Sequence, residues 1–214
     1  WLVERGFGVF DISGLVKAGD NVVRLSAPRM SVHAEIEPVY VFGEFSVVPV
    51  ARGFELRPVA ALALGSWKQQ GLPFYPADVV YSGDFVLAGK GARAAVRLGA
   101  WKGTVAEVRV NGRPAGVLGW QPYEVEITPL VRPGVNRIEV AVTGSLKNRQ
   151  GPHHGKPAPG LVGPGNFRRA PERQPAGSEY DQLDYGLMEP FLVVQGVERA
   201  TGNREDRAST IVIR

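Results

Sequence analysis

Apolar and polar residues alternate in short runs along most of this chain, and Gly or Pro separates one run from the next. The clearest run is NRIEVAVTGSL, residues 136–146, in which Ile138, Val140 and Val142 share one face and Glu139 lies on the other. Alternation with a period of two residues is typical of a strand that buries one face. The pattern therefore predicts a long strand here.

Shorter runs of the same kind predict further strands on both sides of this one. Asn111-Gly112, inside VNGRPAG, is typical of a tight hairpin turn between two strands. No amphipathic pattern predicts a helix longer than about two turns, so the sequence predicts an all-β sandwich. The other predicted strands are DVVYSGDFVLA (78–88), ARAAVRLGAW (92–101), VAEVRV (105–110), PVYVFGEFSVVPV (38–50), FELRPV (54–59), ALAL (61–64), LMEPFLVVQGVERA (187–200) and STIVIR (209–214).

One fourteen-residue pattern occurs twice. ISGLVKAGDNVVRL, residues 12–25, matches ITPLVRPGVNRIEV, residues 127–140, in turn residues as well as in apolar spacing. In the first copy, Asp11 or Ser13 can cap a single helical turn, Gly19 supplies a turn, and NVVRLSA (21–27) reads as a strand. The separation is too long for a solenoid repeat, so the pattern indicates two related domains in tandem. The alternative is a strand-turn-strand pattern that arose twice by chance.

The first copy begins only a few residues into the chain, which opens on Trp1. We therefore expect a piece of a larger protein that carries the tail of one domain and the whole of a second. Residues 149–179 are rich in Gly, Pro and Arg and predict a long loop, of a length that is often functional or disordered.

Composition narrows the function classes. The 27 Gly and 17 Pro among 214 residues suit many short strands joined by turns. The net charge of +4 is spread along the chain, and Arg168, Arg169 and Arg173 read as a solvated loop, so we expect no nucleic-acid partner. The absence of Cys excludes disulfides and thiolate sites, and no apolar run is long enough to predict a membrane span.

The second copy and its surroundings resemble the sugar-binding, galactose-binding-like jelly-roll domains of large glycoside hydrolases, in family 2 β-galactosidase relatives and in α-L-rhamnosidase-like enzymes of the family 106 type. That family has Asp where Glu126 stands, whereas the first copy keeps Asp11. GSWKQQGLPFYPADVVYSGDF, SLKNRQGPHH and YDQLDYGLMEPFLVV resemble additional segments of the rhamnosidase-like group. The matching residues are Val110-Asn111-Gly112, Gly116, Trp120, Pro122, Ile127-Thr128, Leu130, Gly134 and Asn136.

The resemblance implies a jelly-roll fold with four parts. Residues 1–30 would be the C-terminal remnant of an upstream sandwich, 31–64 connecting strands, 65–200 a galactose-binding-like sandwich, and 201–214 a C-terminal strand or tail. In the matching families the catalytic carboxylates belong to a barrel domain, so we expect no catalysis by this chain. Its own acids fall in no pattern that forces two of them into one cleft. These acids are Asp78, Asp84, Glu107, Glu124, Glu126, Asp181 and Asp184.

Proteins commonly bind sugars through aromatic side chains, because the apolar face of a pyranose stacks on the ring while polar groups bind its hydroxyls. Trp67 with Gln69, Gln70 and Tyr75 makes one candidate platform, and packing is the alternative for both rings. For Trp101 and Trp120, near strand ends, we expect packing in the core or between domains. The predicted carbohydrate-binding residues are Trp67, Gln69, Gln70, Tyr75, Tyr81, Asn148, His153 and His154.

Metal binding has little support. His153 and His154 are adjacent, but neighbouring side chains of an extended loop diverge and no third ligand follows at a standard spacing. We expect these histidines to bond backbone or to contact another domain. A structural calcium occurs in such jelly rolls, but no Asp-rich loop of the EF-hand kind is present. We therefore expect no cofactor.

The sequence thus predicts a non-catalytic carbohydrate-binding or accessory module whose partners are carbohydrate and the catalytic domain of the same protein. The alternatives are a purely structural domain that packs on a catalytic barrel, or one that completes a glycosidase active site through the loop at 149–179. We expect a secreted or periplasmic location, although no signal peptide is present in the chain itself.

Overall fold

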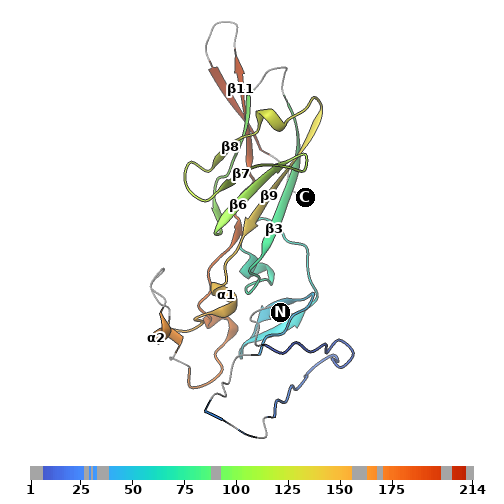
Figure 1. Ribbon diagram of the computed structural model, residues 1–214, viewed down its shortest axis with the longest axis vertical. Helices are drawn as coiled ribbons and strands as arrows, with labels where there is room; N and C mark the ends of the chain where they lie inside the picture. Colours follow the sequence, from blue (N-terminus) through green and yellow to red (C-terminus); the bar gives the residue numbers. More distant parts are fainter. Residues whose placement is uncertain are drawn as a thin grey trace. The chain divides into compact units, whose positions relative to one another are not determined.

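The computed structural model describes residues 7–26, 29, 31–32, 39–87, 93–155, 163–167, 171–198 and 204–210. The chain divides into two compact units, Trp1–Phe42 and Gly43–Arg214 (Figure 1). In the first unit, the described residues form turns and extended segments without a strand. The strand predicted over residues 21–27 is therefore wrong for residues 21–26, and residue 27 lies outside the described residues. A strand needs a partner for its backbone groups, and the described part of this unit supplies none.

The larger unit contains two four-stranded antiparallel sheets. In the first sheet, β3 (Asp78–Val86), β9 (Val135–Thr143), β6 (Val105–Val110) and β7 (Arg113–Leu118) lie side by side in that order (Figure 1). The central strand β9 pairs with β3 from Val86↔Val135 to Asp78↔Thr143. On its other side it pairs with β6. The strands predicted from alternation are confirmed at 78–86, 105–110 and 136–143. Residues 87 and 144–146 lie outside the strands, and residue 88 lies outside the described residues.

The β6–β7 hairpin turns at the predicted Asn-Gly pair. Asn111 has φ 52° and Gly112 has φ 77°, so both residues adopt the left-handed conformation that a two-residue hairpin of this type requires. β7 is an edge strand of the sheet and contains Pro114, and the register between β6 and β7 shifts at Val108/Arg109.

The second sheet has the order β12 (Arg204–Thr210), β11 (Leu192–Glu198), β4 (Arg93–Arg97) and β8 (Glu124–Glu126). Strands at the two predicted C-terminal positions thus pair with each other, β12 lying earlier than STIVIR. Two small two-stranded antiparallel sheets complete the strands, β1 (Ser46–Pro49) with β2 (Phe54–Arg57) and β5 (Trp101–Lys102) with the sequence-distant β10 (Gly186–Leu187). The strand predicted at ALAL (61–64) is wrong, because these residues pair with no strand.

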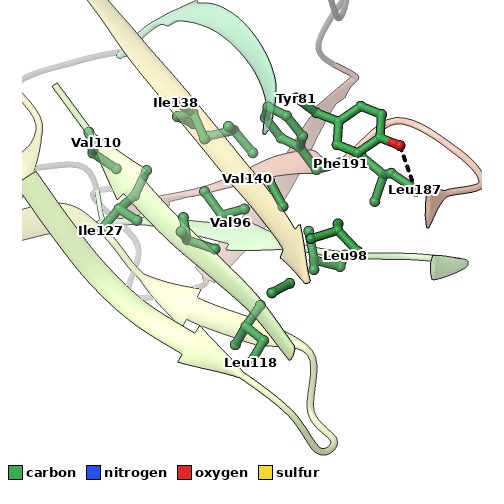
Figure 2. Close-up of a cluster of buried hydrophobic side chains, with 14 of the residues drawn as sticks. Tyr81, Val96, Leu98, Val110, Leu118, Ile127, Ile138, Val140, Leu187 and Phe191 are labelled. Atoms are coloured by element: carbon green, nitrogen blue, oxygen red, sulfur yellow. Dashed lines mark hydrogen bonds between the residues drawn. The ribbon is translucent and has the colours of Figure 1, made fainter. Parts of the chain in front are cut away.

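The core lies between the two four-stranded sheets (Figure 2). β9 contributes Ile138, Val140 and Val142, each 0% exposed, on the face that alternation predicts. β6 adds Val110, and β4 adds Val96 from the opposite sheet. Inward residues of both sheets form one continuous apolar cluster, so the fold is an all-β sandwich.

Helices are short throughout the described part of the chain. They are η1 (Trp67–Gln70), η2 (Thr128–Leu130), α1 (Lys147–Gln150), α2 (Pro164–Phe167) and η3 (Gly177–Glu179). No helix among the described residues is long and apolar enough to cross a membrane. The predicted loop at 149–179 carries α2 and η3 where it is described, and Ala176 forms a parallel bridge with Gly53.

Candidate functional site

Trp67 and Tyr81, two of the predicted binding residues, belong to the core. Their exposed fractions are 1% and 3%. The Trp67 Nε1–H donates a hydrogen bond to the Tyr81 hydroxyl at 2.7 Å. Figure 2 shows that this hydroxyl also accepts from the backbone N–H of Leu187, at 3.2 Å. A ring enclosed on all sides offers no face to a sugar, so the platform predicted on Trp67 is corrected to a packing role.

The other members of that platform differ in accessibility. Tyr75 meets Trp67 edge to face, with ring centroids 6.2 Å apart, and remains 37% exposed while its hydroxyl donates to the Asp78 carbonyl. The side-chain amide of Gln70 is engaged by backbone groups, because it accepts from the N–H of Ala63 and donates to the carbonyl of Ala63. Gln69 is exposed. Tyr75 and Gln69 therefore keep surface that a ligand can reach.

Asn148 is a buried structural residue. Its Nδ2 donates to the Leu183 carbonyl at 2.8 Å and its Oδ1 accepts from the Leu183 N–H at 2.8 Å. With an exposed fraction of 1%, its side chain has no free hydrogen-bonding surface for a sugar. His153 Nε2 donates to the Asn148 carbonyl at 2.8 Å, so the neutral ring carries its proton on Nε2.

His153 and His154 lie in an aromatic group. His153 is 5.6 Å from Tyr180 and His154 is 5.0 Å from it, measured between ring centroids, and Phe74 meets His153 edge to face at 5.8 Å. Burial lowers the pKa of His153, and the nearby charge of Lys147 acts in the same direction. Gln174 donates to the Tyr180 hydroxyl within the same segment of the chain. The hydrogen bond of His153 to the Asn148 carbonyl agrees with the backbone bonding expected of this histidine.

The acidic residues and histidines form no metal-like cluster in the described part of the chain, since no three His, Asp or Glu side chains gather there. Asp184 accepts a hydrogen bond from Ser66 at 2.7 Å, which together with Lys68 and Lys102 lowers the pKa of Asp184, the opposite of what a general acid needs. Other acids form ion pairs with neighbouring cations: Asp84 with Arg137, Glu107 with Arg109, Glu124 with Arg97, Glu126 with Arg93 and Asp181 with Lys147.

Trp120 also differs from one sequence-based expectation, which was packing in the core or between domains. It lies between β7 and β8 and is 79% exposed, which contradicts packing in the core of this chain. The following residues line an open hollow, completed by residues at the end of β4. The lining residues are Arg97, Leu98, Gln121, Pro122, Tyr123 and Glu124.

Aromatic and charged side chains both line the hollow, Tyr123 with Arg97 and Glu124. Trp101 meets Tyr123 edge to face, with ring centroids 5.3 Å apart and planes at 82°. Arg97 Nε donates to Glu124 Oε2 at 2.7 Å. Trp120 directly precedes the lining residue Gln121 in the chain, and an exposed indole can stack on a sugar ring while polar side chains bond the hydroxyls. The signal in the sequence is Trp120 at the end of the predicted hairpin VAEVRVNGRPAGVLGW, directly before Gln121-Pro122.

The known proteins to which this chain is similar are named as glycosidases. No family model matches the chain. A curated protein from Formosa agariphila, named "Putative beta-glucuronidase", is 28% identical over 119 residues, which are 53% of this chain and 10% of that protein.

Solved structures with related arrangements include a rhamnosidase from Novosphingobium sp. PP1Y, with a TM-score of 0.44 at 20% identity. A β-D-glucuronidase from Dictyoglomus thermophilum has a TM-score of 0.36 at 16% identity. The matches cover 77% and 80% of this chain but only 16% and 36% of those chains. The chain thus spans a small part of the proteins it matches, and over about half of its own length its sequence resembles a segment of a glycoside hydrolase.

Proposed function

We propose that this chain is a non-catalytic accessory β-sandwich of a glycoside hydrolase and that it binds carbohydrate through Trp120. The sequence similarity to a curated protein named as a β-glucuronidase supports the glycoside-hydrolase context. The exposure of Trp120 beside a hollow with polar walls carries the binding proposal. Of the Trp residues whose exposure is described, Trp67 is enclosed and Trp101 is half-buried, so Trp120 is the indole with a free face.

The chemistry of the hollow suits a pyranose. The indole offers a flat apolar surface to the C–H face of the sugar, while the Gln121 amide can both donate to and accept from hydroxyls. Arg97 and Glu124 are held by their mutual ion pair, so they present fixed donors and acceptors at the wall. Preorganised polar groups lose little freedom on binding, which favours affinity for a small ligand.

Calorimetry or affinity electrophoresis against a panel of polysaccharides tests the proposal. We expect saturable binding that Trp120→Ala weakens at least about tenfold, because the stacked ring is lost. Tyr75→Ala is the matched control, since Tyr75 is a partly exposed aromatic residue in a different segment. Equal loss in both variants contradicts the assignment to Trp120. Absence of binding to any glycan favours a purely structural domain that packs on a catalytic barrel.

A second candidate is that the long loop contributes to the active site of a neighbouring catalytic domain. The observation that favours it is the group of His153, His154 and Tyr180, which are half-buried and held at the end of the sandwich. Hydrolysis of aryl glycosides by the isolated chain would contradict the proposal that the chain itself is non-catalytic.

We further propose a secreted or periplasmic location, which fractionation of expressing cells would test.

A further inference from the structure

The two copies of the repeated pattern form the same helical turn. In the first copy, the N–H of Leu15 donates to the carbonyl of Ile12 at 2.8 Å. In the second copy, the N–H of Leu130 donates to the carbonyl of Ile127 at 2.9 Å. The corresponding residues thus begin their turns with the same backbone bond.

The turn that follows is also the same, and one Asn side chain closes it in each copy. Asn21 Oδ1 accepts from the N–H of Lys17 at 2.9 Å while its Nδ2 donates to the Lys17 carbonyl at 2.8 Å. Asn136 makes both bonds with Arg132 at 2.8 Å. The glycines two residues earlier, Gly19 and Gly134, both have φ 86°. The local sequence therefore specifies this conformation without help from the surrounding fold.

Burial of the two copies is opposite. Ile127, Ile138 and Val140 are 0% exposed. Val23 and Leu25, which correspond to Ile138 and Val140, are 61% and 72% exposed. The first copy therefore presents to solvent the side chains that the second copy buries in a sandwich. Other exposed apolar residues of this segment are Val9, Phe10, Leu15, Val16 and Val22.

The second copy shows what such a segment packs against. Its strand lies between β3 and β6, which bond its backbone on both edges. Its Asn136 accepts a further hydrogen bond at 2.9 Å from Nδ2 of Asn111, the first residue of the Asn-Gly hairpin turn. Asn111 also donates to the Leu130 carbonyl and accepts from the N–H of Arg137. The complement of this motif is thus an antiparallel sheet that carries an Asn-Gly hairpin beside the turn.

We propose that residues 12–26 are the closing turn and strand of a second β-sandwich. The strand would pair by its two edges between two strands of a sheet built like residues 78–118, and its apolar face would pack into the core of that sandwich. This inference goes beyond the proposed function. A second copy of this chain is not the partner, because its own β9 already occupies the place between β3 and β6. The partner is a separate sheet of the same design, with a free central position and an Asn-Gly hairpin whose Asn bonds Asn21.

An exchange of the repeat inside the full chain tests whether the first copy carries the packing information of a sandwich strand. In this chimera, ISGLVKAGDNVVRL replaces ITPLVRPGVNRIEV at positions 127–140. We expect a cooperative unfolding transition within about 15 °C of that of the parent, measured by circular dichroism, since five positions are identical and the apolar pattern is retained. A second chimera keeps Val140, so that overpacking by Leu cannot be the cause of a failure.

The control chimera interchanges the residues placed at positions 138 and 139, which puts Arg on the buried face and leaves composition unchanged. We expect this control to lose its cooperative transition. In the folded chimera, Asn136→Ala should lower the melting temperature as much as it does in the parent, because the same turn is being opened. If both chimeras fail to fold, if the control folds equally well, or if Asn136→Ala has no effect in the chimera, the inference is overturned.

Discussion

At the scale of single residues, Asn136 joins the turn before β9 to the β6–β7 hairpin through its side-chain amide. It is 0% exposed, yet every part of its amide has a partner in the turn or in the neighbouring hairpin. A buried amide is tolerated only when it is satisfied, and a satisfied one fixes a unique arrangement of the backbone around it.

We therefore expect Asn136→Ala to lower the free energy of unfolding by about 2 to 4 kcal/mol, because it removes several buried hydrogen bonds and leaves Arg132 and Asn111 without this partner. Denaturant titration of the full chain measures the loss. Asn21→Ala is the matched control, since it opens the same turn outside the core and should leave the transition of the larger unit unchanged. Equal losses in the two variants would contradict this account.

At the scale of elements, strand patterns and turn residues could be predicted from the sequence, whereas the burial of individual aromatic side chains could not. The alternation in β9 and the Asn-Gly pair at the β6–β7 turn depend on neighbouring residues, so the sequence alone predicts them. Trp67 and Trp120 both stand beside turns, and no local signal says which one folds inward. Trp67 is buried because Gly186, distant in sequence, lets its ring approach the backbone. The predicted strand at 21–27 has the right pattern but no partner strand among the described residues.

Two glycines compare a backbone cost alone with a backbone cost and a collision together, because Gly112 and Gly186 both have a positive φ, 77° and 132°. Gly112→Ala should destabilise the larger unit by only about 1 kcal/mol, because φ is 77° but nothing lies near the added methyl group. Gly186→Ala should cost about 3 kcal/mol or more, since its Cβ would lie 2.4 Å from the Gly65 carbonyl and 2.9 Å from Trp67 Nε1. Thermal unfolding of the two variants compares them, and equal shifts would contradict the packing around Trp67.

At the scale of the whole molecule, the core and the first unit are separate in sequence. All residues of the described apolar cluster lie within the larger unit, Gly43–Arg214. This separation explains why the fold class could be predicted while the surroundings of the first copy of the repeat could not. A pattern reports how a segment folds locally, but its partner can be another part of a longer protein.

Removal of residues 1–42 should therefore leave the sandwich intact. We expect the shortened chain to unfold in one cooperative transition within about 3 °C of the full chain, because no core side chain is deleted. Differential scanning calorimetry measures both transitions. A loss of cooperativity, or a much lower midpoint, would show that the first unit contributes to the stability of the sandwich.

The edge of the first sheet has a consequence for how these molecules behave in concentrated solution. β7 carries Pro114, which has no backbone N–H to donate, and its pairing with β6 shifts register at Val108/Arg109. An irregular edge is a poor template for a strand from another molecule. The protein can thus hold an exposed apolar segment elsewhere and still resist growth into fibres along this border.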